Sequence, residues 1–307
     1  MSAVVVASDV VKKFGGFVAV DNLSFSIRAG ECFGLLGPNG AGKSTMISML
    51  YGAAARSGGQ LQVFGLDPET DAKHIKKRIG VVTQENALDE ALTVVENMRV
   101  FAGYSGLDAL EADQRIEELL NFMLLEQKKN APIRSLSGGM QRRLVFVRAL
   151  LPKPDLVILD EPTTGLDPAV RHLLWEKIIS LKQSGVTILL TTHYMDEAER
   201  LCDRLVIMDN GKIRAEGHPK DLIAQNCPGY VALFENRPEI RNILSQVGPP
   251  HEFAFAEESQ QLALRHQRLD ALTEVIKQKG LDCTFIRPSN LEDVFLHITG
   301  KELTGNA

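Results

Sequence analysis

Long apolar runs are missing from this sequence of 307 residues. No run approaches the roughly 20 apolar residues that a helix needs to span a bilayer. The N-terminus also lacks the basic segment, apolar core and cleavage site of a secretory signal. We therefore expect a chain that neither crosses a membrane nor is secreted.

Cysteine is scarce, and its four positions stand apart in the sequence: Cys32, Cys202, Cys227 and Cys283. No C-x-x-C spacing is present among them. Isolated cysteines of this kind are typical of core thiols in a reducing compartment. The sequence therefore predicts a cytoplasmic location.

Positive charge is not in excess, because the chain has 34 Lys and Arg residues but 39 Asp and Glu residues, which gives a net charge of -5. No strong basic field is available to hold nucleic acid by counterion release, so we expect no nucleic acid partner. The composition, 44% hydrophobic and 24% charged, is ordinary for a globular protein. A chain of this length is expected to form about two domains.

One complete phosphate-loop (Walker A) motif, G-x-x-x-x-G-K-[ST], follows an apolar run. Its residues are Gly37, Pro38, Asn39, Gly40, Ala41, Gly42, Lys43, Ser44 and Thr45. The glycines let successive backbone N–H groups point inward, and the helix expected over 46–50 adds its positive end, so a polyphosphate fits the loop. In such a motif Lys43 reaches the β- and γ-phosphates and Ser44 binds Mg²⁺.

Polar side chains end three further apolar runs that we expect to be buried strands. Gln84 follows residues 78–82, Asp160 and Glu161 follow residues 156–159, and His193 follows residues 186–190. Ligands bind at the carboxyl ends of strands in open α/β sheets, so these side chains are expected to face a nucleotide. Asp160 is placed to hold Mg²⁺ through its hydration shell, and Glu161 to orient or deprotonate an attacking water. Taken singly, Gln84 and His193 are also compatible with ordinary structural roles.

A helical period replaces the strand pattern between residues 93 and 151. A capping box begins at Thr93, and further helices are expected over 111–125 and 140–151. We therefore predict a helical subdomain, about 88–153, inserted between strands. Ser137 is a natural N-cap of its last helix, and Gly138 and Gly139 leave that helix start open to an anion. A solvated N-cap without a ligand is the alternative.

The N-terminal apolar stretches, at 4–6, 17–20, 23–27 and 32–36, alternate with turn signals. They predict a small antiparallel layer that delivers a buried strand into the phosphate loop. Phe14 lies on this layer, where its ring either stacks on a purine or packs in the core. Further along, Asn210-Gly211 between two short stretches predicts a hairpin that closes the sheet edge.

In this order the segments resemble the successive motifs of ATP-binding subunits of ABC transporters, over residues 1–220. The matching segments are the phosphate loop, Gln84, residues 136–141 (Leu-Ser-Gly-Gly-Met-Gln), residues 156–161, the turn at 165–168 and His193. The resemblance implies an α/β fold with a P-loop ABC ATPase core, which comprises a mixed sheet, an antiparallel β layer and the inserted helical subdomain. Phe14 stands where the family commonly has tyrosine, and Thr83 where it often has proline; both departures leave ATP binding intact.

The resemblance also implies ATP hydrolysis with Mg²⁺ as cofactor. It implies a head-to-tail homodimer with two ATP sandwiches, in which ATP on Lys43 of one subunit meets the Ser137-Gly138-Gly139 segment of the other. Glu161 would polarise the water and His193 would contact the γ-phosphate. The metal would be held by Ser44, Gln84 and Asp160, and the turn at Asp167 would communicate across the interface.

Residues 225–307 lie beyond the nucleotide-binding domain expected at 1–220. Strand-like stretches at 231–234, 253–256, 262–266 and 283–287 alternate with helical stretches at 239–247 and 269–279. This order predicts a small α+β accessory domain of ferredoxin-like type. Asn290 caps a final helix that stops at Gly300 and carries one apolar face, which docks either on its own domain or on a partner.

Residues 192–200 and the C-terminal helix resemble those of exporter ATPases of the daunorubicin-resistance and nodulation lipo-oligosaccharide type. This resemblance implies an ATPase that energises a separate membrane permease and exports a drug-like or lipid-linked molecule. The permease would hold it, as a peripheral subunit, at the cytoplasmic face of the inner membrane. The alternative is a soluble ABC-type ATPase that acts as a mechanical or regulatory factor without transport. A phosphotransferase that uses the same loop would leave residues 136–141 unexplained.

Overall fold

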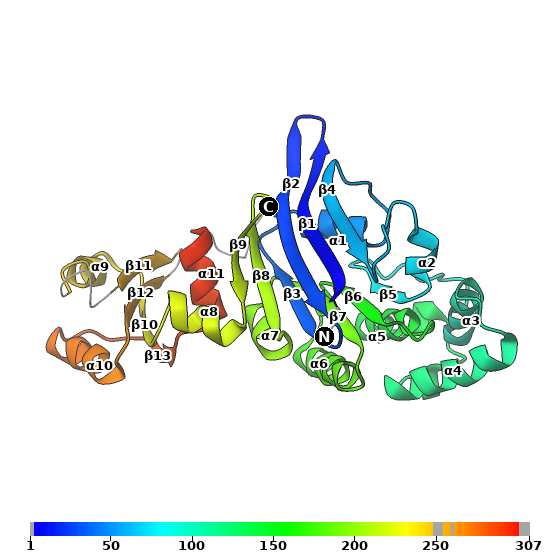
Figure 1. The fold of residues 1–307 in the computed structure, drawn as a ribbon. Helices are drawn as coiled ribbons and strands as arrows, with labels where there is room; N and C mark the ends of the chain where they lie inside the picture. The colour runs from blue at the N-terminus through cyan, green and yellow to red at the C-terminus, as the bar shows by residue number, and fades with distance from the viewer. Residues whose placement is uncertain (1–2, 248–253, 259–260, 301–307) are drawn as a thin grey trace. The chain divides into compact units, whose positions relative to one another are not determined.

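The structure, a computed structural model, describes residues 3–247, 254–258 and 261–300. The chain divides into two compact units, Met1–Glu216 and Gly217–Ala307, and each is described by itself (Figure 1). The sequence predicted domains at 1–220 and 225–307. Within the described residues no helix is long and apolar enough to cross a membrane.

A six-stranded sheet forms the centre of the first unit, with the order β5-β6-β7-β3-β8-β9. Its strands are β3 (Cys32–Leu36), β5 (Ile79–Val82), β6 (Leu156–Asp160), β7 (Thr187–Thr192), β8 (Arg204–Asp209) and β9 (Lys212–Gly217). The strands from β5 to β8 pair in parallel. Such strands are covered on both faces, which explains why β3, β6 and β7 read as nearly continuous apolar runs. The predicted hairpin joins β8 to β9, and both Asn210 and Gly211 have the positive φ that its two-residue turn needs.

A separate antiparallel sheet has the order β2-β1-β4, with β1 at Ala3–Phe14, β2 at Phe17–Arg28 and β4 at Gly58–Val63. The sequence placed residues 32–36 in this layer, and that expectation was wrong, since β3 pairs with β7 and β8 instead. The two predicted stretches at 17–20 and 23–27 also form one strand. Asn22, at φ 54°, lies in a bulge of the β1–β2 ladder rather than in a turn. Phe25 of β2 stacks on Phe33 of β3 with ring centroids 5.5 Å apart, so the two sheets share one core.

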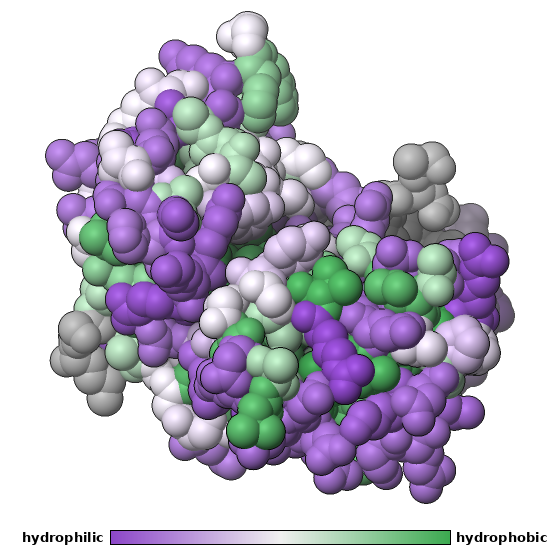
Figure 2. Space-filling model, turned by 90° about the vertical axis from the view of Figure 1, so that its right-hand side faces the viewer, coloured by the Kyte–Doolittle hydropathy of each residue, from purple (hydrophilic) through white to green (hydrophobic). Residues whose placement is uncertain are grey.

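Helices of the first unit include α1 (Lys43–Leu50), α2 (Ala72–Lys76), α6 (Pro168–Gln183) and α7 (Met195–Leu201). The helical segment between β5 and β6 contains α3 (Val94–Tyr104), α4 (Ala109–Phe122) and α5 (Gly138–Ala149), with 3₁₀ turns at Glu126–Lys128 and Ile133–Ser135. The predicted capping box at Thr93 is present. Helix α4 begins earlier than predicted because Asp108 caps it. Figure 2 views the molecule from the side of α3 and α4, where apolar patches lie among hydrophilic ones.

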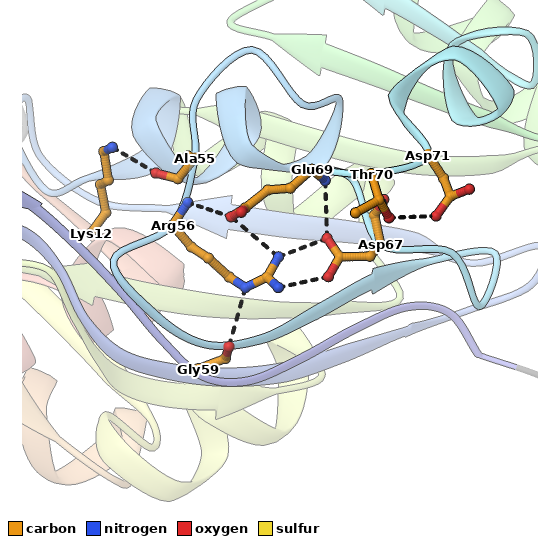
Figure 3. Close-up of polar contacts among 8 residues, drawn as sticks. All are labelled: Lys12, Ala55, Arg56, Gly59, Asp67, Glu69, Thr70 and Asp71. Atoms are coloured by element: carbon orange, nitrogen blue, oxygen red, sulfur yellow. Dashed lines mark hydrogen bonds and ion pairs between the residues drawn. The ribbon is translucent and has the colours of Figure 1, made fainter.

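The connection between α1 and β4 is held by the side chain of Arg56 (Figure 3). Its two terminal nitrogens donate to the carboxylate of Asp67 over 2.8 and 2.6 Å, and its Nε donates to the carbonyl of Gly59 over 3.2 Å. The backbone amide of Arg56 donates to Glu69, whose own amide donates to Asp67. These contacts fix the chain that leads from the phosphate-loop helix back to the antiparallel sheet.

The second unit contains a four-stranded antiparallel sheet with the order β11-β12-β10-β13. Its elements are α8 (Pro219–Asn226), β10 (Tyr230–Glu235), α9 (Pro238–Leu244), β11 (Ala254–Glu258), β12 (Gln261–His266), α10 (Leu269–Gln278), β13 (Phe285–Pro288) and α11 (Leu291–Thr299). The first residue of the strand predicted at 253–256 lies outside the described residues. Helix α11 has the predicted Asn290 cap and packs on α8 within this unit. The buried carboxylate of Asp293 on α11 is paired with Arg265 and Arg287.

We predict that Asp67→Asn lowers the free energy of unfolding by about 1 kcal/mol, because it removes a charge-assisted, bidentate contact that solvent partly screens. Hydrogen bonds from Arg56 hold the pKa of Asp67 below its usual value. This contribution is therefore present above the unfolded pKa of about 3.9 and is lost as the pH falls through the lower folded value. Urea denaturation at pH 7 and at pH 3 measures both effects. Asp113→Asn is the control, since Asp113 and its partner Arg99 are half exposed and the pair should contribute little.

Candidate functional site

The loop before α1 follows a path that only glycine tolerates at two of its positions. Gly37 and Gly42 have φ values of 157° and 102°. A Cβ atom on Gly37 would lie 2.5 Å from the carbonyl oxygen of Met208, and one on Gly42 would lie 2.3 Å from that of Ala19. The loop is therefore packed between β2 and β8, and its backbone conformation is fixed before any ligand binds.

Lys43, the first residue of α1, is buried at the centre of this loop. Its ammonium donates hydrogen bonds to the carbonyls of Gly37 and Pro38, over 2.7 and 3.1 Å. Burial lowers the pKa of Lys43, while the nearby charges of Glu161 and Asp160 act in the opposite direction. The lysine thus lies within the field of both carboxylates, as expected if all three residues serve one polyphosphate site.

Asp160 and Glu161 are positioned by the neighbouring strand β7. The hydroxyl of Thr191 donates a short hydrogen bond to Asp160 Oδ1, and the amide of Glu161 donates to the Thr191 carbonyl over 3.0 Å. Glu161 has a φ of 47°, a left-handed conformation that is rare for glutamate. Its Oε2 accepts from the hydroxyl of Thr164 over 3.2 Å and lies 3.4 Å from Nδ1 of His193.

The structure brings most of the predicted residues to one edge of the sheet. Asp160, Glu161 and His193 come from the carboxyl ends of adjacent parallel strands, and Lys43 lies beside them. Gln84 follows β5 at the same edge, with an exposed side chain. Ser44 is exposed on the first turn of α1.

Two groups of predicted residues lie outside this cluster. Phe14 is 54% exposed at the end of β1, with Lys12 Nζ 4.7 Å from its ring centroid. The core alternative for Phe14 is therefore excluded. Ser137 caps α5 by accepting a hydrogen bond from the amide of Met140, and Gly138 and Gly139 form the start of that helix.

Sequence reasoning missed several residues that support the site. Thr191 is one of three threonines in β7, so the sequence alone does not single it out. Arg142 lies on α5 and donates to backbone carbonyls at the ends of β5 and β6. No sequence signal distinguishes it from the arginine beside it.

The buried carboxylate of Glu197 is the other supporting group that was missed. Its Oε1 accepts hydrogen bonds of 2.9 Å from both Thr163 and the indole of Trp175. Burial raises the pKa of Glu197, although its hydrogen bonds act in the opposite direction. Glu197 thereby joins the turn after Glu161 to helices α6 and α7.

Known proteins are similar to this chain in both sequence and fold. The sequence profile of the ABC transporter family matches residues 20–164. The Nod factor export ATP-binding protein I of Ralstonia nicotianae is 46% identical over 300 residues, which cover 95% of this chain and 92% of that protein. The protein of the same name from Cupriavidus metallidurans is 42% identical, with 99% of each chain covered.

The chain belongs to the ABC transporter ATP-binding family.

Solved structures of ABC transporter ATP-binding proteins share the fold over much of the chain. The ATP-binding subunit of an ABC transporter matches with a TM-score of 0.67 and 32% identity, covering 72% of this chain and 92% of that one. A dimeric ATP-binding cassette in a post-hydrolysis state, bound to ADP and phosphate, matches with a TM-score of 0.64 and 26% identity, covering 70% and 98%. The expected α/β P-loop ATPase fold is confirmed. This ABC ATPase binds ATP and hydrolyses it in an activity coupled to transport.

We predict that Glu197→Met destabilises the ABC ATPase by about 2–4 kcal/mol, because it leaves two buried donors without an acceptor. Glu197→Gln keeps one acceptor oxygen and should cost clearly less. Denaturant unfolding can be followed by the fluorescence of Trp175, the single tryptophan of the chain. Equal midpoints for the Met, Gln and unaltered proteins would contradict the supporting role of Glu197.

Proposed function

We propose that this ABC ATPase energises a separate membrane permease that exports a lipid-linked or drug-like molecule. The observation that carries the proposal is the extent of the match to Nod factor export ATP-binding proteins. It covers 95% of this chain and so includes the second unit as well as the ATPase core. No observation favours the alternative of a mechanical or regulatory ATPase without transport. The permease would hold the subunit at the cytoplasmic face of the inner membrane.

The site residues take the following roles in the proposed reaction. Lys43 exchanges its bonds to the loop carbonyls for the β- and γ-phosphates of ATP. Glu161, held by Thr164 and His193, orients and deprotonates the attacking water, and His193 contacts the γ-phosphate. Gln84, which follows β5 with an exposed side chain, would contact the same water and the metal.

Three of the predicted site residues carry oxygen atoms suited to binding Mg²⁺. The hydroxyl of Ser44, the amide oxygen of Gln84 and the carboxylate of Asp160 are the hard donors that this ion prefers. The carboxylate of Asp160 is oriented by Thr191, as expected for a group that holds the hydration shell of an ion. When bound, Mg²⁺ would neutralise charge on the β- and γ-phosphates.

The proposed working form is a homodimer with two ATP sandwiches. ATP on the loop from Gly37 to Thr45 would contact Ser137, Gly138 and Gly139 of the partner copy, which lie at an open helix start. The exposed ring of Phe14, which Lys12 Nζ approaches to 4.7 Å, would stack on the adenine. Asp167, the N-cap of α6, would communicate across the interface. The dimeric form of a structural relative supports this arrangement.

The permease contact is proposed at a groove of about 700 Å³ whose walls come from α2, β5, α3 and the end of α5. Its lining includes the aromatic residues Phe101 and Tyr104 and the basic residues Lys73 and Lys76. Arg148, on its wall, donates to the carbonyl of Ala87 over 2.6 Å, three residues after Gln84. A helix seated in this groove would therefore be linked to the segment that carries Gln84.

For the domains we propose a nucleotide-binding domain at 1–220, with its helical subdomain at about 88–153, and an accessory domain at 225–307. The order β11-β12-β10-β13, with helices α9 and α10 in the two crossovers, supports a ferredoxin-like type for the accessory domain.

Glu161→Gln should retain ATP binding but lower turnover by about 100-fold or more, because the geometry survives while the base is lost. The trapped nucleotide should then accumulate the dimer, which sedimentation velocity with ATP measures. Lys43→Ala is the contrasting variant, since it should abolish both ATP binding and the dimer. Normal turnover by the Gln variant would place the base elsewhere.

Affinity purification from detergent-solubilised cells tests the export function. We expect a polytopic membrane protein to accompany the chain in stoichiometric amount. The control is the Phe101→Asp variant, which introduces a charge into the groove and should lose the partner while keeping its ATP affinity. Recovery of the unaltered chain alone or with ribosomes would contradict transport but leave the ATPase assignment intact.

A further inference from the structure

Arg142 lies on α5, one turn after the Ser137-Gly138-Gly139 segment, and is only 5% exposed. Its guanidinium donates only to backbone carbonyls among its described hydrogen bonds. The acceptors are Pro162 (2.8 Å, from Nε), Thr83 and Gln84 (2.5 and 3.1 Å, from Nη1), and Asp160 and Glu161 (3.1 and 2.8 Å, from Nη2).

These carbonyls belong to two segments that both leave the sheet at its ligand-binding edge. Thr83 and Gln84 follow β5, whereas Asp160 to Pro162 end β6 and begin the next turn. Beyond the last paired residues, Val82 and Leu159, the ladder between β5 and β6 stops. The planar fork of Arg142 therefore ties the two segments together at the point where sheet hydrogen bonding ends.

Charge around Arg142 suits this role. Burial lowers the pKa of its guanidinium, while the carboxylates of Asp160, Glu197 and Glu161 act in the opposite direction. A buried cation surrounded by carbonyl dipoles and near carboxylates holds its neighbours in one arrangement, because any displacement leaves strong donors unpaired.

We propose that Arg142 is a positioning residue that couples the Ser137-Gly138-Gly139 helix to the segments of Gln84 and Glu161 in the same subunit. The inference rests on the proposed dimer, in which that helix contacts the partner's ATP. Contact with one ATP would thus be transmitted through Arg142 to the water-activating carboxylate at the other. The carboxylate of Glu161 would then respond to the ATP on the partner's phosphate loop as well as to the ATP on its own.

Arg142→Lys tests the coupling, because lysine keeps the charge but cannot reach carbonyls of both segments at once. We expect a somewhat lower melting temperature, because buried carbonyls lose donors, but an unchanged ATP affinity of the monomer and a kcat lowered about tenfold. In the Glu161→Gln background, half-maximal dimerisation should need about tenfold more ATP, a shift of about 1.4 kcal/mol. Arg115→Lys is the matched control. Arg115 lies on α4 and, like Arg142, donates to a backbone carbonyl, that of Leu150. It should change none of these values.

The possible results distinguish the role of Arg142 from the proposed ATP-dependent dimer. Normal kcat and normal dimerisation in Arg142→Lys would overturn the inference alone. So would a fall in melting temperature and ATP affinity together, which indicates an ordinary structural role, or a fall in kcat without a change in dimerisation. Failure of Glu161→Gln itself to dimerise with ATP would overturn the proposed dimer and the inference with it.

Discussion

Parallel hydrogen bonding among β5, β6, β7 and β3 is the constraint on which the site depends. Strands that run in the same direction deliver their carboxyl ends to one edge, so residues more than a hundred positions apart in sequence meet there. The register of β6 and β7 pairs Asp160 with Thr191, whose hydroxyl then reaches the carboxylate. A slip of one residue would turn these side chains to opposite faces of the sheet.

The same edge of the sheet brings several charged side chains together, and two of them are buried. Two buried cations, Lys43 and Arg142, lie in the field of Asp160 and Glu161, and each pKa reflects a balance between burial and attraction. Lys43 uses loop carbonyls as acceptors, whereas Arg142 uses the carbonyls of strand ends. The first set can be exchanged for phosphate oxygens, while the second is internal to the framework. The site thus combines one adaptable cation with one fixed cation.

The sequence predicted most of the strands and several helix caps, because these depend on local chemistry. Thr93, Ser137 and Asn290 cap the helices that they were expected to cap, and Gly211 forms its hairpin. Partners distant in sequence were harder to predict. An apolar stretch such as residues 32–36 fits either sheet, and only long-range pairing with β7 and β8 decides between them. Arg142 contacts backbone carbonyls, which every residue carries. Its partners therefore could not be predicted from the pattern of side chains.

Four cysteines that stand apart in sequence are not all apart in space. Cys202, at the end of α7, has its thiol hydrogen-bonded with that of Cys32 on β3, and this contact together with burial raises the pKa of Cys202. Cys283 in the second unit is only half buried, in contrast to the expectation that all four lie in the core.

The left-handed backbone conformation of Glu161 affects which substitutions at this position would stabilise the protein. A non-glycine residue held in that region stores about 1–3 kcal/mol of strain, which the surrounding fold must offset. Glycine at this position would relieve the strain and remove the carboxylate in the same step. Selection for thermal robustness alone would therefore favour losing the residue proposed as the base. Its retention would indicate that turnover, rather than stability, is what selection maintains at this position.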